Sequence, residues 1–241
     1  MSLFRPQLWS LPAAETNPEH LAQLETTLAE RLRTVATRHP QAVFASSLAV
    51  EDMIIADCIN RHHFPLRIIT LDTGRLHAET LSLIDASRHF PIITEVFRPD
   101  GESAAAFDQT HGSSAMYESI ELRRECCRIR KIEPLNRALA DAPAWLTGQR
   151  RSQSDTRSQL DFEETDNVRD IAKFNPIFDW SESDVWLYAH AYQVPLNPLY
   201  HQGFPSIGCE PCTRPVKLGE DIRAGRWWWE QKDSKECGLH K

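Results

Sequence analysis

Residues 42–52 read Ala-Val-Phe-Ala-Ser-Ser-Leu-Ala-Val-Glu-Asp and combine an apolar run with a polar turn and the start of a helix. The apolar run at 42–46 predicts a buried strand, and the helix after the turn is expected to extend to about His62. At such a strand–helix turn, the free N–H groups of the helix N-terminus attract anions. The turn lacks the G-x-x-x-x-G-K-S/T pattern, so it is not a Walker P-loop and is a weak signal alone.

Strands and helices continue to alternate on both sides of this unit. We expect further strands near residues 66–71, 92–97, 144–148 and 171–178, and helices near 18–38, 76–89, 116–122, 128–140 and 181–192. This alternation predicts an α/β fold, in which a single doubly wound, mostly parallel sheet carries helices on both faces. Ligands of such sheets bind at the carboxyl ends of the strands, where the turns at 46–52, 72–74 and 148–151 are expected.

The 241 residues are expected to form a single domain, residues 1–241, because they contain no internal repeat and no long linker. Residues 1–40 predict an N-terminal helical extension, with Asn17 as the N-cap and Pro18 in the first turn of its helix. After Pro195 the pattern changes to Pro, Gly, Cys and Trp. This change predicts an irregular C-terminal tail, residues 195–241, folded over the core.

Composition excludes several classes of protein. The 27 Lys and Arg against 34 Asp and Glu give a net charge of −7, which argues against a nucleic-acid partner. With 41% hydrophobic and 25% charged residues, the chain resembles a folded soluble protein. No run of 18 apolar residues occurs, and the first eleven residues do not form a secretory signal. We therefore expect no membrane partner and a cytoplasmic location, while a homo-oligomer remains open.

The six cysteines are unevenly placed. Cys126 and Cys127 are adjacent, and Cys209 and Cys212 form a C-x-x-C pair. Four thiolates can hold zinc or a 4Fe–4S cluster. Zinc ligands usually come in knuckles that adjacent cysteines cannot form, and five cations within residues 123–131 would offset the negative charge of a cluster. We therefore favour the cluster; zinc and simple burial of the cysteines are the alternatives.

Cys237 lies near the end of the sequence, where a cysteine is normally an incidental exposed thiol. Three neighbours favour a reactive thiol instead. Lys235 can stabilise a thiolate, Gly238 lets the backbone approach a ligand, and His240 can donate a hydrogen bond. Cys58, by contrast, lies among apolar residues and is expected in the core.

Two further segments carry cations suited to an anionic ligand. Residues 223–230 combine two arginines with three consecutive tryptophans, and residues 147–157 place three arginines after a predicted strand. Arg binds phosphate or sulfate oxygens bidentately, and Trp offers a flat face for a base. At least one of the three adjacent indoles is expected outside the core. Aromatic packing on the body and a solvated charged loop are the structural alternatives.

Together these motifs resemble the assimilatory adenylyl-sulfate (adenosine 5′-phosphosulfate) reductases of bacteria, in the 3′-phosphoadenylyl-sulfate (PAPS) reductase family. The matching motifs run in family order: residues 46–52, 71–74, 126–127, 147–154, 209–212, 223–230 and 236–240. The joint occurrence of Cys-Cys, C-x-x-C and a terminal Glu-Cys-Gly-Leu-His is highly specific. One departure is Ala49, where family members often carry Gly.

The resemblance implies an adenine nucleotide α-hydrolase-like fold and one 4Fe–4S cluster per subunit. Its ligands would be Cys126, Cys127, Cys209 and Cys212. The catalytic residues would be Cys237 as the nucleophile, His240, and Lys131 at the family's cluster-proximal lysine. The expected substrate-binding residues are Ser46, Ser47, Glu51, Asp52, Leu71, Asp72, Gly74, Gly148, Arg150, Arg157, Arg223, Arg226 and Trp227.

The implied reaction converts adenylyl sulfate to sulfite and AMP, as in sulfate assimilation and cysteine biosynthesis. The Cys237 thiolate would attack the sulfur, AMP would leave, and a cysteine S-sulfonate would remain. Cys237 lies four residues before the last residue, and Cys209 and Cys212 are assigned to the cluster. We therefore expect a separate reductant, namely thioredoxin or alternatively glutaredoxin.

Three other functions stay open. A PAPS reductase or a dual-substrate enzyme would differ only in accepting the 3′-phosphate. An ATP pyrophosphatase or sulfurtransferase is disfavoured because residues 46–52 lack the Ser-Gly-Gly-x-Asp-Ser turn. An iron–sulfur redox sensor that binds a nucleotide would produce no sulfite.

Overall fold

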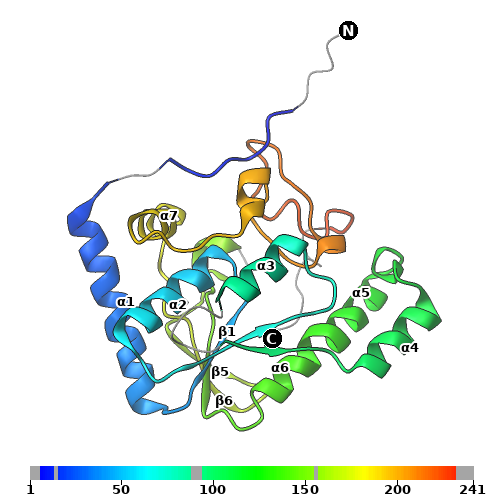
Figure 1. Cartoon of the computed structure of the whole chain (residues 1–241), viewed down its shortest axis with the longest axis horizontal. Coiled ribbons are helices and arrows are strands. Elements are labelled where there is room, and N and C mark those ends of the chain that lie inside the picture. The colour runs from blue at the N-terminus through cyan, green and yellow to red at the C-terminus, as the bar shows by residue number, and fades with distance from the viewer. Residues whose placement is uncertain (1–5, 14–15, 88–93, 155–156, 232–241) are drawn as a thin grey trace.

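The polar turn after β1 (Val43–Ser46) lies where the strand order of the sheet changes direction. In the computed structural model, which describes residues 6–13, 16–87, 94–154 and 157–231, six strands form one sheet in the order β3-β2-β1-β4-β6-β5 (Figure 1). The other strands are β2 (Arg67–Leu71), β3 (Thr94–Phe97), β4 (Ala144–Leu146), β5 (Glu163–Asp166) and β6 (Ile171–Phe174). All neighbouring strands are parallel except β5 and β6. The predicted doubly wound, mostly parallel sheet is therefore confirmed.

Seven α-helices and several shorter helical turns connect the strands in the described part of the chain. The α-helices are α1 (Pro18–Arg38), α2 (Val50–His62), α3 (Ala78–Ser87), α4 (Gly101–His111), α5 (Ile120–Cys127), α6 (Glu133–Ala138) and α7 (Glu182–Ala191). Shorter turns are η1 (Ala115–Tyr117), the π-turn η2 (Arg128–Ile132), η3 (Arg151–Gln153), η5 (Pro198–Gln202) and η6 (Glu210–Cys212). In the described part of the chain, no helix is long and apolar enough to cross a membrane.

The two faces of the sheet bury different sets of side chains. Phe44 of β1 and Ile68 of β2 belong to a large core with α1, α2 and α7. Their neighbours Val43 and Ile69 point to the opposite face and pack against α6. Since successive strand residues alternate between faces, this division places helices on both sides of the sheet.

Helix α1 is part of the main core. Its N-cap is Asn17, whose side chain accepts a hydrogen bond from the backbone N–H of His20 (3.2 Å), and Pro18 occupies the first turn, both as expected. Leu28 and Leu32 are fully buried against α2 and α7. The helix predicted within residues 1–40 thus forms part of the domain's hydrophobic interior.

Two elements were not predicted. Helix α4 begins at the N-cap Asp100, which accepts from the Ser103 N–H (2.8 Å), but buries only Ala104 and Phe107, so its apolar pattern is weak. Strand β5 is an exposed antiparallel edge strand of mostly acidic residues. Acidic residues are depleted in strands, which explains why the pattern of β5 was missed.

The helical region after α4 also differs from expectation. We expected helices at 116–122 and 128–140, whereas α5 extends to Cys127 and continues through the π-turn η2 into α6. In η2 the N–H of Glu133 bonds the carbonyl of Arg128, five residues back. The π-turn places Lys131 immediately beyond the adjacent cysteines, and such turns occur often at functional sites.

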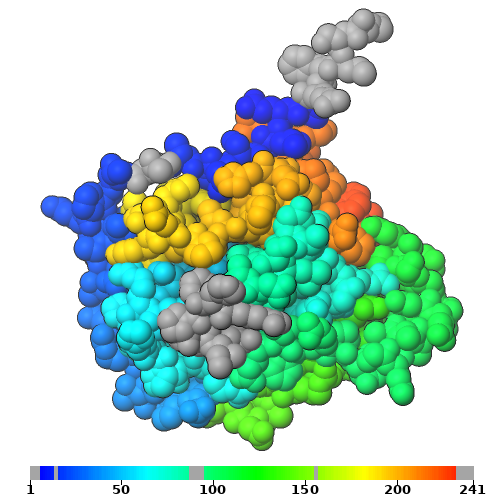
Figure 2. All heavy atoms as spheres, viewed as in Figure 1, coloured from blue at the N-terminus to red at the C-terminus, as the bar shows by residue number. Residues whose placement is uncertain are grey.

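Residues 196–231 are irregular, as predicted, and lie over the end of the sheet. They contain the short turns η5 and η6, and an isolated bridge joins Leu76 to Cys209. A second bridge joins Leu8 to Lys217, so the residues around Leu8 lie against this segment (Figure 2).

Replacing Leu28 with Ala is expected to lower the free energy of unfolding by about 2–5 kcal/mol, because the cavity is created in a fully buried position. Urea denaturation measures the loss. Glu30→Ala on the exposed side of α1 is the control and should change stability by less than about 0.5 kcal/mol. A loss below about 1 kcal/mol for Leu28→Ala would contradict the structural role of α1.

Candidate active site

A cavity of about 230 Å³ lies at the carboxyl ends of β1, β2 and β4. Its lining includes residues 45–47, 49, 51 and 52 after β1, residues 70, 71 and 73 at the end of β2, and residues 147–149 after β4. Residues 205–209, 222–223 and 226–227 of the C-terminal segment cover it. The predicted residues that line it are Ser46, Ser47, Glu51, Asp52, Leu71, Lys131, Gly148, Arg157, Cys209, Arg223, Arg226 and Trp227. The cavity therefore occupies the position at which doubly wound sheets bind ligands.

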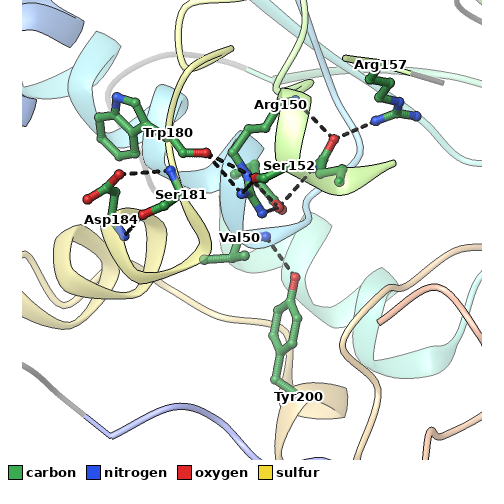
Figure 3. A network of polar contacts seen from close by, with 10 residues as sticks. Val50, Arg150, Ser152, Arg157, Trp180, Ser181, Asp184 and Tyr200 are labelled. Atoms are coloured by element: carbon green, nitrogen blue, oxygen red, sulfur yellow. Dashed lines mark hydrogen bonds and ion pairs between the residues drawn. The ribbon is translucent and has the colours of Figure 1, made fainter. Parts of the chain in front are cut away.

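The turn after β1 is held by its own side chains. Asp52 accepts hydrogen bonds from the N–H (2.6 Å) and the hydroxyl (2.5 Å) of Ser47. The N–H of Val50, at the start of α2, donates to the buried Tyr200 hydroxyl (2.9 Å; Figure 3). Leu48 has a left-handed backbone (φ 63°), whereas Ala49 has an ordinary φ of −71°. Position 49 therefore does not require the Gly that family members often carry.

Gly148 brings the β4 turn into contact with this first turn. A Cβ atom at position 148 would lie 2.1 Å from the Asp52 carboxylate oxygen, so only glycine fits. The pKa of Asp52 is raised to about 6, chiefly by burial and to a lesser extent by the adjacent Glu51, against the opposing effect of hydrogen bonds from Ser47 and Gly148. A carboxyl group at this edge of the cavity therefore titrates near neutral pH.

Arg150 does not lie among the described residues that line the cavity. Its guanidinium donates to Glu51 (2.8 Å) and to the Trp180 carbonyl (3.2 Å), and its side chain is 3% exposed. Its charge is paired with Glu51 away from the cavity lining, and its predicted substrate-binding role stays a prediction.

Asp72 and Gly74 also lie outside the lining of the cavity as far as the structure describes it. Asp72 accepts from Arg98 (3.0 Å) and from the Gly74 N–H (3.0 Å). Gly74 has φ +70°, a conformation that favours glycine, and lies close to Arg130. These residues shape the turn after β2, which carries the cavity-lining Leu71.

Cations gather on the covering side of the cavity. Arg226 donates to the Ile207 carbonyl (3.0 Å) and to Ser206 (3.3 Å). A Cβ atom at Gly208 would lie 2.5 Å from the Arg226 guanidinium, so this glycine allows the close approach. With Lys131, Arg157 and Arg223, Arg226 makes the cavity suitable for a ligand that carries several negative charges.

A second void, of about 10 Å³, lies beside the first. All four cysteines of the predicted cluster site line it, together with Lys131, Trp227, Met116, Pro211 and the arginines Arg75, Arg123 and Arg130. All four cysteines are buried, and none of the four is in a disulfide. The structure therefore brings Cys126–Cys127 and Cys209–Cys212 together from segments more than 80 residues apart.

The donor set of this void fits a polynuclear iron–sulfur group. Burial raises the pKa of Cys126 and raises that of Cys212 to about 11, and in both cases the neighbouring Cys209 adds to the increase. Such thiols ionise readily only beside a bound metal or other cation. Thr73 contacts the Cys209 sulfur (3.2 Å). Among the described residues, no three His, Cys, Asp or Glu side chains are grouped as a site for a single metal ion.

Trp227 forms a wall shared by both voids. Its indole is 1% exposed, packs against Cys209 and Cys212, and lies 4.8–4.9 Å from the guanidinium groups of Arg123 and Arg226. The ring is therefore enclosed rather than open to solvent, and its predicted contact with substrate stays a prediction. As expected for three adjacent indoles, Trp228 is exposed.

Sequence reasoning missed three residues of the site. Tyr200 fixes the start of α2, Thr73 contacts Cys209, and Gln153 lines the main cavity. Thr73 and Gln153 lie within quoted motifs, but neither carries a charge that marks it. Cys237 and His240 lie outside the described residues.

The fold and the position of the site place this protein in the adenine nucleotide α-hydrolase-like class of α/β proteins. A family model described as "Phosphoadenosine phosphosulfate reductase domain" matches residues 41–215. The adenosine 5′-phosphosulfate reductase of Neisseria meningitidis serogroup A is 59% identical to this chain over the whole of both chains. The protein of the same name from Burkholderia cepacia is 54% identical to it, over 95% of this chain and 91% of that one. The chain belongs to the phosphoadenosine phosphosulfate reductase family.

Solved structures agree with this assignment. The phosphoadenylyl-sulfate reductase of Candida auris, in a phosphate complex, has a TM-score of 0.66 and 26% identity over 83% of this chain and 98% of that one. The FMN adenylyltransferase of Candida glabrata has a TM-score of 0.58 and 14% identity over 95% of this chain and 82% of that one, which shows a shared fold alone.

Asp52→Asn is expected to gain stability relative to the wild type as the pH rises. The folded pKa of about 6 lies above the ordinary value of 3.8, so the wild type loses stability as the pH rises through this range. Between about pH 4.5 and about pH 7.5, the difference in unfolding free energy should shift by about 2 kcal/mol toward the variant.

Urea titrations at both pH values measure this shift. Asp161→Asn, at an exposed position, is the control and should follow the wild type. A difference between Asp52→Asn and the wild type that stays constant, or moves the other way, is incompatible with a buried carboxyl group of raised pKa.

Proposed function

We propose that this protein reduces adenylyl sulfate to sulfite and AMP, with thioredoxin as the reductant. The observation that carries the proposal is the wall shared by the cationic cavity and the four-cysteine void. Lys131, Cys209 and Trp227 line both spaces. A nucleotide in the first space and a cluster in the second would therefore be neighbours. Relatives of this chain carry the name adenosine 5′-phosphosulfate reductase.

The cavity suits the phosphosulfate group. Arg157, Arg223 and Arg226 would bind its oxygens, and the N-terminus of α2 supplies further partial positive charge. The turn of residues 46–52 would face the nucleotide. As negative charge develops on the departing AMP phosphate, these fixed cations stabilise it without reorganisation.

Cys126, Cys127, Cys209 and Cys212 would hold a 4Fe–4S cluster. When bound, the cluster would supply a fixed charge distribution beside the substrate rather than electrons, because the two electrons that reduce the sulfate sulfur to sulfite would come from the thioredoxin thiols. Lys131 would neutralise part of the charge of the thiolate ligands and present its ammonium group to the sulfate oxygens. Its role is electrostatic.

Cys237 would be the nucleophile. Its thiolate forms a bond to the sulfur of adenylyl sulfate, the S–O bond to the phosphate breaks, and AMP leaves with the electron pair. His240 would donate a hydrogen bond at this step. The product on the protein is a cysteine S-sulfonate.

Release of sulfite needs a second thiol. Cys58 cannot supply it, because it is fully buried and burial raises its pKa to about 12. The other four described cysteines line the cluster void. We therefore propose that a thioredoxin thiolate attacks the Cys237 sulfur, sulfite leaves, and the second thioredoxin thiol resolves the mixed disulfide. This chemistry suits sulfate assimilation in a reducing cytoplasm.

Incubation with adenylyl sulfate, under anaerobic conditions and without reductant, is expected to leave a sulfonate on Cys237 and to release one equivalent of AMP. Peptide mass mapping locates the adduct. Cys237→Ser should show none, whereas Cys58→Ala should retain the adduct. Absence of the adduct on iron-loaded protein would refute the reductase proposal and favour a redox sensor. An adduct from PAPS as well would make the enzyme dual in substrate.

Cys127→Ser is expected to lose most of its iron, because one of four ligands is removed, whereas Cys58→Ala should keep about four irons per chain. Lys131→Ala is the matched variant at the same void: it should keep the iron and lose turnover. Iron and sulfide analysis of anaerobically purified protein measures the first effect, and sulfite release the second. Full iron content in Cys127→Ser, or normal turnover in Lys131→Ala, contradicts the assignment of that residue.

A further inference from the structure

Gln153 lines the main cavity and belongs to a polar network with Glu51, Arg150 and Arg157. Figure 3 shows Arg150 and Arg157 reaching this network from different directions. Arg157 lines the cavity and is half-buried, whereas Arg150 is almost fully buried and paired with Glu51. Gln153 contacts all three of these charged residues.

Both ends of the Gln153 amide have defined partners. Its Oε1 accepts from the Arg157 guanidinium and from the Arg150 backbone N–H (3.1 Å). Its Nε2 donates to Glu51 Oε1 (2.9 Å). An amide oxygen accepts from a cation and an amide nitrogen donates to a carboxylate, so the charges on either side fix the orientation of the Gln153 amide.

The far end of the network is rigid. Glu51 Oε1 also accepts from Arg150 Nη2 (2.8 Å), and Arg150 Nη1 donates to Ser152 (2.6 Å) and to the Trp180 carbonyl (3.2 Å). Glu51 itself belongs to the first turn of α2. Gln153 is therefore attached to a buried ion pair at the base of the anion-binding turn.

Arg157 needs such an attachment to act as an anion ligand. An arginine side chain has many rotamers, and ordering it costs conformational free energy at the moment of binding. A hydrogen bond from one guanidinium nitrogen to a fixed amide oxygen removes part of this freedom before the ligand arrives. The guanidinium would then meet ligand oxygens in a defined orientation.

We propose that Gln153 is a positioning residue, which holds Arg157 in the orientation that binds the phosphate-side oxygens of the nucleotide. This inference rests on the proposed function, since it assumes that the cavity binds an adenine nucleotide. Gln153 does not act on the substrate itself; its effect passes through Arg157. Its effect on binding should therefore disappear when Arg157 is absent.

The test is a double-mutant cycle on AMP affinity, measured by isothermal titration calorimetry on the full chain. Gln153→Met should weaken AMP binding about tenfold, the order expected for one charge-assisted hydrogen bond. In an Arg157→Met background, the same change should alter affinity by less than about twofold. A merely structural role for Gln153 would weaken binding equally in both backgrounds.

Gln202→Met makes the same side-chain change on an exposed glutamine that contacts Glu79, and it should bind AMP like the wild type. If Gln153→Met does not fold, Gln153→Asn carries the test, because the shorter amide cannot reach both Glu51 and Arg157. Unchanged AMP affinity in a folded Gln153 variant, or losses that add in the double variant, overturns the inference. Wild-type protein that does not bind AMP would instead overturn the proposed function.

Discussion

The attachment of the C-terminal segment to the end of β2 determines the rest of the site. Cys209 pairs with Leu76 in an isolated antiparallel bridge, and the next N–H, of Glu210, donates to the Arg75 carbonyl (2.8 Å). These backbone bonds bring Cys209 and Cys212 to the adjacent cysteines at the end of α5. Without them, the segment would neither cover the nucleotide-sized cavity nor complete the set of four thiols.

One consequence of this attachment is that the main cavity and the four-cysteine void lie side by side, with cationic side chains around both. Arg226 donates hydrogen bonds to the hydroxyl oxygen of Ser206 and the carbonyl oxygen of Ile207. Arg123 forms a buried ion pair with Glu230 (2.8 Å). Lys131 reaches both spaces from the π-turn after Cys127. The arrangement allows a negatively charged nucleotide and four cysteine sulfurs to lie close together without mutual repulsion.

The sequence predicted what depends on local pattern and on chemically distinctive residues. The helix capped by Asn17, the strand at 43–46 and the four cysteines each follow from short-range signals. The pairing of Arg150 with Glu51 could not be predicted, because both are charged residues in a turn and only tertiary packing decides which of them faces the ligand. Strand β5 was missed because its acidic residues disfavour a strand until β6 provides a partner. Burial of the Trp227 ring could not be predicted, because it depends on Arg123 and Met116, which lie more than 100 residues away in sequence.

In the proposed arrangement, the nucleotide and the cluster occupy adjacent spaces separated by Lys131, Cys209 and Trp227. A crystal structure of anaerobically prepared protein with AMP, with diffraction data collected at the iron absorption edge, would locate both groups. We expect anomalous density bordered by Cys126, Cys127, Cys209 and Cys212, and an AMP phosphate among Arg157, Arg223 and Arg226. Iron located elsewhere, or AMP bound away from the carboxyl ends of β1 and β4, would contradict it.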